Sequence, residues 1–132
     1  MRRVFLDTNV LIYAFSEDAR RDRARELLRE GGAISVQSLN EFANVARRKL
    51  GIDWTEVRDS LTVIASRCGP ALPLTPELSR EGLRLAERYC LSVYDGMSVA
   101  AALALECDAV LSEDMHAGLE IDGKLTVVNP FA

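Results

Sequence analysis

Short apolar runs alternate with longer amphipathic segments along this chain. The apolar runs span three or four residues each and are typical of buried strands, which we expect at Arg3 to Leu6, Ala33 to Val36, Ala71 to Leu74, Ala109 to Leu111 and Leu125 to Val128. In the longer segments apolar residues recur every three or four positions, which predicts helices over residues 9–15, 17–30, 38–50, 55–67, 76–89 and 94–107. Strands that alternate with helices in this way predict an α/β fold whose parallel sheet has helices on both faces.

The length of the chain predicts one domain over residues 1–132, and no linker, repeat or low-complexity segment divides it. No apolar run approaches the ~20 residues of a membrane span, and the N-terminal residues lack the pattern of a secretory signal. The three cysteines are far apart in the sequence, and His116 is the only histidine. This predicts reduced thiols in a cytoplasmic protein rather than a zinc site.

Charge is distributed unevenly, although the net charge is only −4. Residues 1–50 carry ten Lys or Arg and seven Asp or Glu, whereas residues 51–132 carry six and thirteen. Such asymmetry can mark a surface for a charged ligand. The alternative for each basic cluster is the solvated face of a helix.

Four carboxylates lie at strand ends or in first helical turns, which is where open α/β folds carry their functional sites. Asp7 ends the first predicted strand, Asp114 follows the fourth, and Glu41 and Asp95 lie in the first turns of predicted helices. Ligands of such sheets bind outside the carboxyl ends of the strands. Each acid also has a structural interpretation.

The structural interpretations are helix caps and turns. Asp7, or its neighbours Thr8 and Asn9, can cap the first helix. Ser38 with Glu41, and Ser92 with Asp95, match capping boxes. Asp114 can be a turn residue or a cap, and Glu113 can be an exposed turn residue.

Caps alone do not explain several acids that converge. A first-turn carboxylate gains roughly 0.3–1 kcal/mol from the helix dipole, whereas two charges ~4 Å apart repel by about 4 kcal/mol at an effective dielectric of 20. A cluster of acids therefore requires a cation, and oxygen ligands suit Mg²⁺ or Mn²⁺. A metal of this kind supports hydrolysis of a phosphodiester. The chain shows no GxSxG, Cys–His pair or P-loop that would supply another chemistry.

At these residues the chain resembles a known family, the PIN-domain ribonucleases, and within it the VapC-type toxins of toxin–antitoxin pairs. The resemblance covers nearly the whole chain and rests on four motifs in order, which are FLDTNVLIY, SLNEFANV, YDGMSVAAAL and LSEDM, followed by VVNPF near the end. Two departures are Gly96, where alanine is common, and Ser112, where threonine is more usual. Neither departure removes a carboxylate.

The resemblance implies a three-layer α/β/α fold with a mainly parallel central sheet, and cleavage of RNA with Mg²⁺ or Mn²⁺. It also implies a homodimer that a cognate antitoxin neutralises. The implied metal ligands and catalytic residues are Asp7, Glu41, Asp95 and Asp114. The implied hydrogen-bond partners that orient these acids are Thr8, Asn9 and Ser112. The candidates for contacts with RNA phosphate are Arg20, Arg21, Arg23, Arg25, Arg47, Arg48 and Lys49.

Two other functions compete with this one. An aspartyl phosphotransferase of the haloacid-dehalogenase kind also begins with a strand and an aspartate, but Asn9 stands where its second aspartate belongs. A catalytically inactive PIN module would bind RNA or a protein partner without cutting. The RNA target stays open among transfer, ribosomal and messenger RNA, since RNA recognition depends on shape and unpaired bases.

Overall fold

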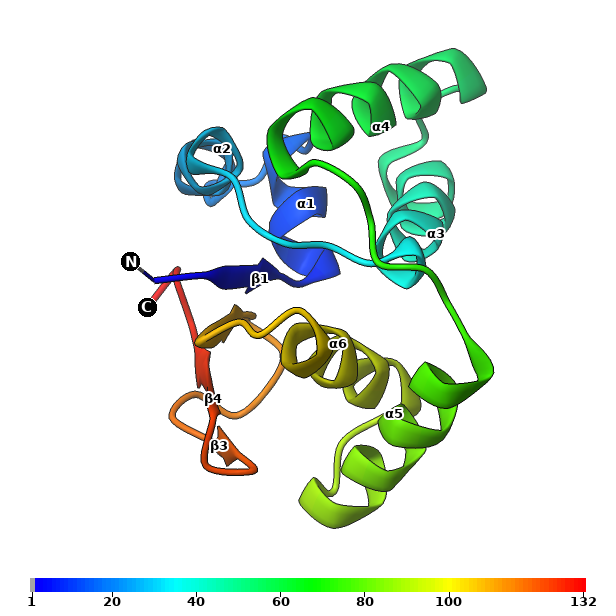
Figure 1. The fold of residues 1–132 in the computed structure, drawn as a ribbon. Coiled ribbons are helices and arrows are strands. Elements are labelled where there is room, and N and C mark those ends of the chain that lie inside the picture. Colours follow the sequence, from blue (N-terminus) through cyan, green and yellow to red (C-terminus); the bar gives the residue numbers. More distant parts are fainter. Residues whose placement is uncertain (1) are drawn as a thin grey trace.

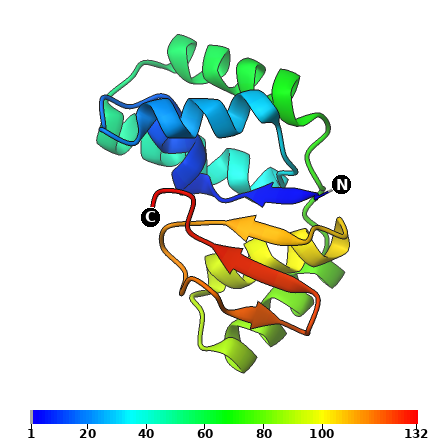
Figure 2. The ribbon, with the colours of Figure 1, turned by 90° about the vertical axis from the view of Figure 1, so that its left-hand side faces the viewer.

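A four-stranded sheet forms the centre of the protein in the computed structural model, which describes residues 2–132. The sheet has the order β1-β2-β4-β3. The strands are β1 (Val4–Leu6), β2 (Ala109–Leu111), β3 (Glu120–Ile121) and β4 (Leu125–Val128). β1, β2 and β4 are parallel, and β3 pairs with β4 in the antiparallel direction (Figure 2). The predicted mainly parallel sheet is confirmed.

Helices cover both faces of this sheet, which confirms the predicted three-layer α/β/α fold (Figure 1). One layer contains α1 (Thr8–Ala14), α2 (Arg21–Glu30), α3 (Val36–Val45), the π-helical turn η1 (Ala46–Leu50) and α4 (Trp54–Cys68). The other layer contains α5 (Pro76–Tyr89) and α6 (Val93–Ala104). None of the helices in residues 2–132 is long and apolar enough to cross a membrane.

Alternation along the strands divides the buried residues into two cores. Phe5 and Val110 pack toward α5 and α6, whereas Leu6 and Leu111 pack toward α1 to α4. Successive side chains of a strand point to opposite faces, so a strand of three residues serves both layers. Each such buried side chain contributes roughly 1.5–3 kcal/mol relative to an exposed one.

α5 and α6 pack with their backbones close together, at a contact between two glycines. A Cβ atom on Gly96 would overlap the carbonyl oxygen of Gly82 and would lie 2.9 Å from the Cβ of Ala86. This contact explains why glycine follows Asp95, where alanine is common in the family that the chain resembles. The close crossing fixes the first turn of α6, and Asp95 belongs to that turn.

Two of the predicted strands are wrong. Instead of strands over residues 33–36 and 71–74, the structure has isolated parallel bridges that join Phe5 to Ala33 and Ser35 to Leu72. The chain passes beside β1 for too short a distance to form a strand, because Ser35 already caps α3 and the helix begins at Val36. The antiparallel β3 was not expected from the pattern.

The start and end of the third helix also differ from the prediction. The capping box that begins α3 joins Ser35 and Ser38, so the predicted box of Ser38 with Glu41 is wrong. The predicted helix over 38–50 changes at Ala46 into η1, which ends at Leu50 and is followed by Gly51 with φ of 64°. π turns of this kind are often found at functional sites. Ser92 caps α6, since it accepts a hydrogen bond from the backbone nitrogen of Asp95, but within residues 2–132 no return bond from the Ser92 amide to Asp95 completes the predicted capping box.

Candidate active site

Asp7 is a buried carboxylate at the end of β1, with 5% of its surface exposed. Its Oδ1 accepts hydrogen bonds from the backbone N–H of Thr8 at 2.9 Å and from Ser98 Oγ at 3.2 Å. Its Oδ2 accepts from Ser112 Oγ at 2.7 Å and from Asn9 Nδ2 at 3.3 Å. Burial raises the pKa of Asp7, although the bonds from Ser112, Thr8 and Ser98 oppose the rise. Asp7 therefore caps α1, and the donors Ser98, Ser112 and Asn9 fix the orientation of its carboxylate.

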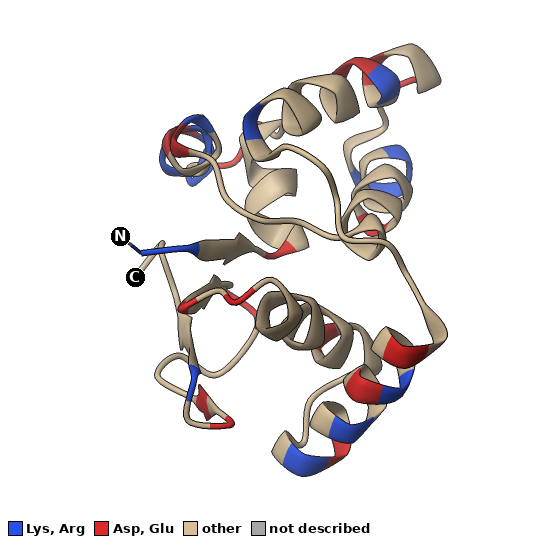
Figure 3. Cartoon of the chain, viewed as in Figure 1, with Lys and Arg blue, Asp and Glu red and all other residues tan. Residues whose placement is uncertain are grey.

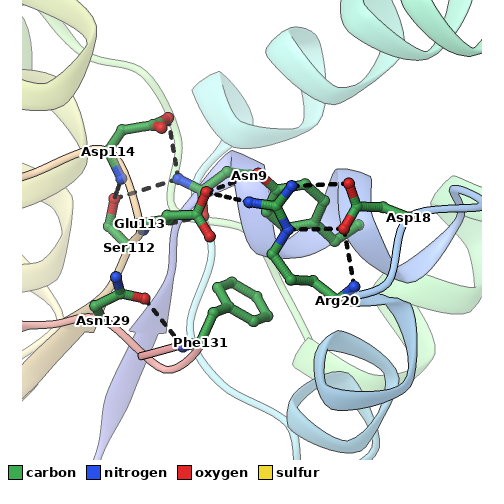
Figure 4. A network of polar contacts seen from close by, with 9 residues as sticks. Asn9, Asp18, Arg20, Ser112, Glu113, Asp114, Asn129 and Phe131 are labelled. Carbon is green, nitrogen blue, oxygen red and sulfur yellow. Dashed lines mark hydrogen bonds and ion pairs between the residues drawn. The ribbon is translucent and has the colours of Figure 1, made fainter.

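Asn9 links the end of β1 to the loop after β2. Its Nδ2 lies 3.2 Å from both Ser112 Oγ and Asp114 Oδ2, and its Oδ1 accepts from the backbone nitrogen of Glu113 at 3.3 Å (Figure 4). Ser112 Oγ also accepts from the backbone nitrogen of Asp114 at 3.2 Å. The side-chain amide of Asn9 thus connects the motifs around residues 7 and 114, which are more than 100 positions apart in the sequence.

Glu41 lies half-buried on α3, where Gln37 Nε2 donates to its Oε1 at 3.2 Å. Burial raises the pKa of Glu41, and the negative charges of Asp7, Asp95 and Asp114 raise it further. These four carboxylates are therefore near enough for their charges to interact. Figure 3 shows acidic positions at the end of β1, on α3 and on α6.

Asp95 occupies the first turn of α6 and is partly buried. Burial raises its pKa, the charge of Asp7 raises it further, and the bond with Ser92 opposes the rise. Asp114 is exposed and contacts Asn9. The group of acids thus extends from buried Asp7 to exposed Asp114.

The donors of this group fit a hard divalent cation. As placed, no three Asp, Glu, His or Cys side chains among residues 2–132 form a ready metal site. The side chains that interact are carboxylates, with hydroxyl and amide groups beside them, which is the chemistry that Mg²⁺ and Mn²⁺ prefer. The buried Oγ1 of Thr8 has no hydrogen-bond partner within residues 2–132. A buried hydroxyl without a partner is costly, and this one directly follows Asp7 in the chain.

A groove of about 300 Å³ is lined by two of the four acids, Glu41 and Asp114, whereas Asp7 and Asp95 are not part of its lining. Its lining combines the polar site with an apolar wall and one cation, and consists of Thr8, Asn9, Ile12, Tyr13, Glu41, Val45, Lys49 and Asp114. A lysine in a groove with two carboxylates makes the groove suitable for a ligand that carries both a cation and negative oxygens.

The three basic residues of η1 have separate surroundings. Arg47 donates to the carbonyl oxygen of Ile52 at 2.9 Å, and its guanidinium lies 4.6 Å from the centre of the Trp54 ring. Arg48 is exposed, and Lys49 lines the groove. The structure therefore places only Lys49 of this run beside the acids.

Sequence reasoning missed Ser98, Gln37 and the partners of Glu113. Ser98 stands one helical turn after Asp95, in a segment that is otherwise almost entirely apolar, so its hydroxyl was a usable signal. Glu113 is not the exposed turn residue that was predicted. Its side chain is 25% exposed and forms an ion pair with Arg20.

Comparison with known proteins agrees with this architecture. Residues 4–117 match the family model described as PIN domain, and a search of curated protein sequences found no match. A toxin–antitoxin complex from Klebsiella pneumoniae superposes with a TM-score of 0.72 at 20% identity, over 97% of this chain and 98% of that one.

Two further solved structures are similar to the chain. VapBC2 from Rickettsia felis, bound to a DNA fragment from its promoter, has a TM-score of 0.66 at 18% identity, over 96% of this chain and 98% of that one. Mycobacterium tuberculosis VapC20, a toxin that cleaves the sarcin–ricin loop, has a TM-score of 0.64 at 20% identity, over 84% of this chain and 91% of that one. At these identities the likeness establishes a common fold.

Proposed function

The chain belongs to the PIN-domain family, and on that premise we propose that it is an endoribonuclease that depends on Mg²⁺ or Mn²⁺. The observation that carries the proposal is a buried carboxylate, Asp7, with Glu41, Asp95 and Asp114 near enough for the negative charges to raise the pKa of Glu41. Burial and like charge raise the pKa of Glu41 and Asp95, which is the mark of acids that are held near one another without a counter-charge. A divalent cation held by these acids would supply that counter-charge.

Asp7, Glu41, Asp95 and Asp114 would hold the metal. When bound, a divalent cation lowers the pKa of its water and offsets negative charge on the phosphodiester. Asp7 has the firmest orientation, since donors bind both of its oxygens. Thr8 would orient Asp7 through its backbone N–H, which donates to Asp7 Oδ1.

The rest of the groove would orient the RNA. Lys49 would pair with a phosphate oxygen beside the acids, whereas Arg47 is held by Ile52 and Trp54. The apolar wall of Ile12 and Val45 would exclude water from one side of the bound strand. Of the three basic residues in η1, we therefore propose that Lys49 contacts RNA phosphate. Arg48 is exposed beside it.

The proposed biological role is that of a toxin in a toxin–antitoxin pair. Two of the similar structures are such complexes, and the third is a toxin that cleaves an RNA loop. We therefore propose RNA as the substrate, a cognate antitoxin as the partner, and a homodimer as the active form.

Activity of the purified protein, freed of antitoxin, tests this function. We expect it to cut structured RNA in Mg²⁺ or Mn²⁺ and to stop in EDTA. Asp7→Asn should abolish cleavage while the circular dichroism spectrum is unchanged, and the exposed Asp59→Asn on α4 should cut like the wild type. Cleavage in EDTA would refute the metal mechanism. RNA binding without cleavage would favour the inactive PIN module.

A further inference from the structure

Glu113 and Asp114 are neighbours in the chain but have different partners (Figure 4). Asp114 contacts Asn9, whereas Glu113 Oε1 accepts from Arg20 Nη1 at 2.5 Å and from Tyr13 Oη at 2.9 Å. The guanidinium of Arg20 also lies 4.3 Å from the centre of the Tyr13 ring. We call Tyr13, Arg20 and Glu113 the clamp.

The clamp is itself well fixed. Asp18 accepts from Nε and Nη2 of Arg20 at 2.7 and 2.8 Å, which sets the plane of the guanidinium before it reaches Glu113. Phe131 packs edge-on against Tyr13, with ring centres 5.2 Å apart. Burial and the bond to Glu113 raise the pKa of Tyr13 to about 12, so its hydroxyl stays a donor.

The clamp adds side-chain contacts to the loop after β2, in which the flanking residues Ser112 and Met115 are buried. The backbone nitrogens of Glu113 and Asp114 reach Asn9 and Ser112 only at 3.3 and 3.2 Å, near the long end for hydrogen bonds. An exposed ion pair adds roughly 0–1 kcal/mol to stability, and the Arg20–Glu113 pair is partly buried, with side chains that are 39% and 25% exposed. The shorter contacts of the clamp restrict where the loop can place Asp114.

We propose that Glu113 is a positioning residue, whose contacts with Arg20 and Tyr13 hold Asp114 toward the metal-binding acids. The inference rests on the proposed metal site and adds to it. It also gives the two adjacent acids different roles: Asp114 would bind the cation, and Glu113 would hold Asp114 in position. The clamp joins the loop between α1 and α2 to the loop after β2.

Titration of the purified protein with Mn²⁺, followed by the electron paramagnetic resonance signal of free Mn²⁺, tests this proposal. Glu113→Gln should weaken Mn²⁺ binding about tenfold, the lower end of the effect of residues that orient metal ligands. Arg20→Gln should cause the same loss from the other side of the contact. Glu81→Gln is the matched control, because it breaks a 2.5 Å pair with Arg84 on α5 and should bind Mn²⁺ like the wild type.

Two further measurements separate positioning from a general loss of structure. In the Asp114→Asn background, Glu113→Gln should cause no additional loss of Mn²⁺ affinity, because its effect passes through Asp114. Hydrogen exchange at the amide of Asp114 should become faster in Glu113→Gln without any metal present.

The outcomes distinguish this proposal from the function on which it rests. A further tenfold loss in the Asp114→Asn background would overturn the positioning role. Wild-type affinity in Glu113→Gln would overturn it as well, while the metal site would stand. A wild-type protein that binds no Mn²⁺ would overturn the metal site and the positioning role together.

Discussion

Replacing Gly96 by alanine tests the packing that positions Asp95. A methyl group at residue 96 would overlap the carbonyl oxygen of Gly82 and would lie 2.9 Å from Ala86 Cβ and 3.2 Å from Ala86 N. Two of these three atoms belong to the backbone of α5, which has no rotamer by which to move aside. The helices must therefore separate, and α6 must shift together with Asp95.

The expected loss of stability follows from two opposing contributions. Overpacking of this kind costs about 1–3 kcal/mol, and a rigid backbone neighbour places the cost in the upper part of that range. Alanine is better than glycine in a helix by about 1 kcal/mol. Gly96→Ala should therefore lower the free energy of unfolding by about 1–2 kcal/mol. The melting temperature should fall by roughly 3 °C or more.

Urea denaturation of the metal-free protein measures this loss, and Gly82→Ala is the matched control. A Cβ atom on Gly82 would meet the sulfur and terminal methyl of Met97, which can move, although it would also lie 3.2 Å from Met97 Cα. Gly82→Ala should therefore lose less stability than Gly96→Ala. Equal or greater stability of Gly96→Ala than of the wild type would refute the packing argument.

The basic turn and the acids give two further predictions. Lys49→Ala should reduce the salt dependence of RNA binding by roughly one unit of slope, whereas Arg47→Ala should leave the slope unchanged and lower thermal stability; equal slopes for wild type and Lys49→Ala, measured by fluorescence anisotropy, would remove Lys49 from the interface. The raised pKa values of Asp7, Glu41 and Asp95 mean that the folded metal-free protein binds protons more tightly than the unfolded chain. Stability from these groups is present below the unfolded pKa values near 4 and is lost as pH rises through the raised folded values. In thermal melts Asp95→Asn should raise the melting temperature of the metal-free protein at pH 7.5 and reduce the stabilisation by Mg²⁺; a fall in the metal-free melting temperature, with no Mg²⁺ effect in either protein, would assign Asp95 to a capping role only.

The helices and the parallel strands were predictable because their own residues carry the pattern. Ala109 to Leu111 is apolar at every position, and both layers bury it. The pairing of residues 33–36 was not predictable in the same way. An apolar run predicts extended chain, but the point at which Ser35 ends that chain and caps a helix depends on tertiary contacts.

The positions of the acids could be predicted, whereas the surroundings of the acids could not. Asp7 and Asp114 were found because strand ends of a parallel sheet share one edge. The separate surroundings of Arg47 and Lys49 depend on the π turn, which no local pattern indicated. The partners of Glu113 are Tyr13 and Arg20, which lie about 100 positions earlier in the sequence, so no rule of local spacing could identify them.

Alternation in β1 makes the chemistry of this protein inseparable from its folding. Phe5 enters the core beside α6, Leu6 enters the opposite core, and Asp7 continues the ladder through its N–H to the carbonyl oxygen of Leu111 at 3.1 Å. Its side chain therefore returns to the side of α6, where Ser98 donates to it. A slip of one residue in β1 would exchange both cores and turn the aspartate to the opposite face at the same time. Selection for a stable fold therefore also preserves the orientation of the Asp7 side chain. A redesign of this strand must keep the alternation that points Phe5 and Asp7 to one side and Leu6 to the other.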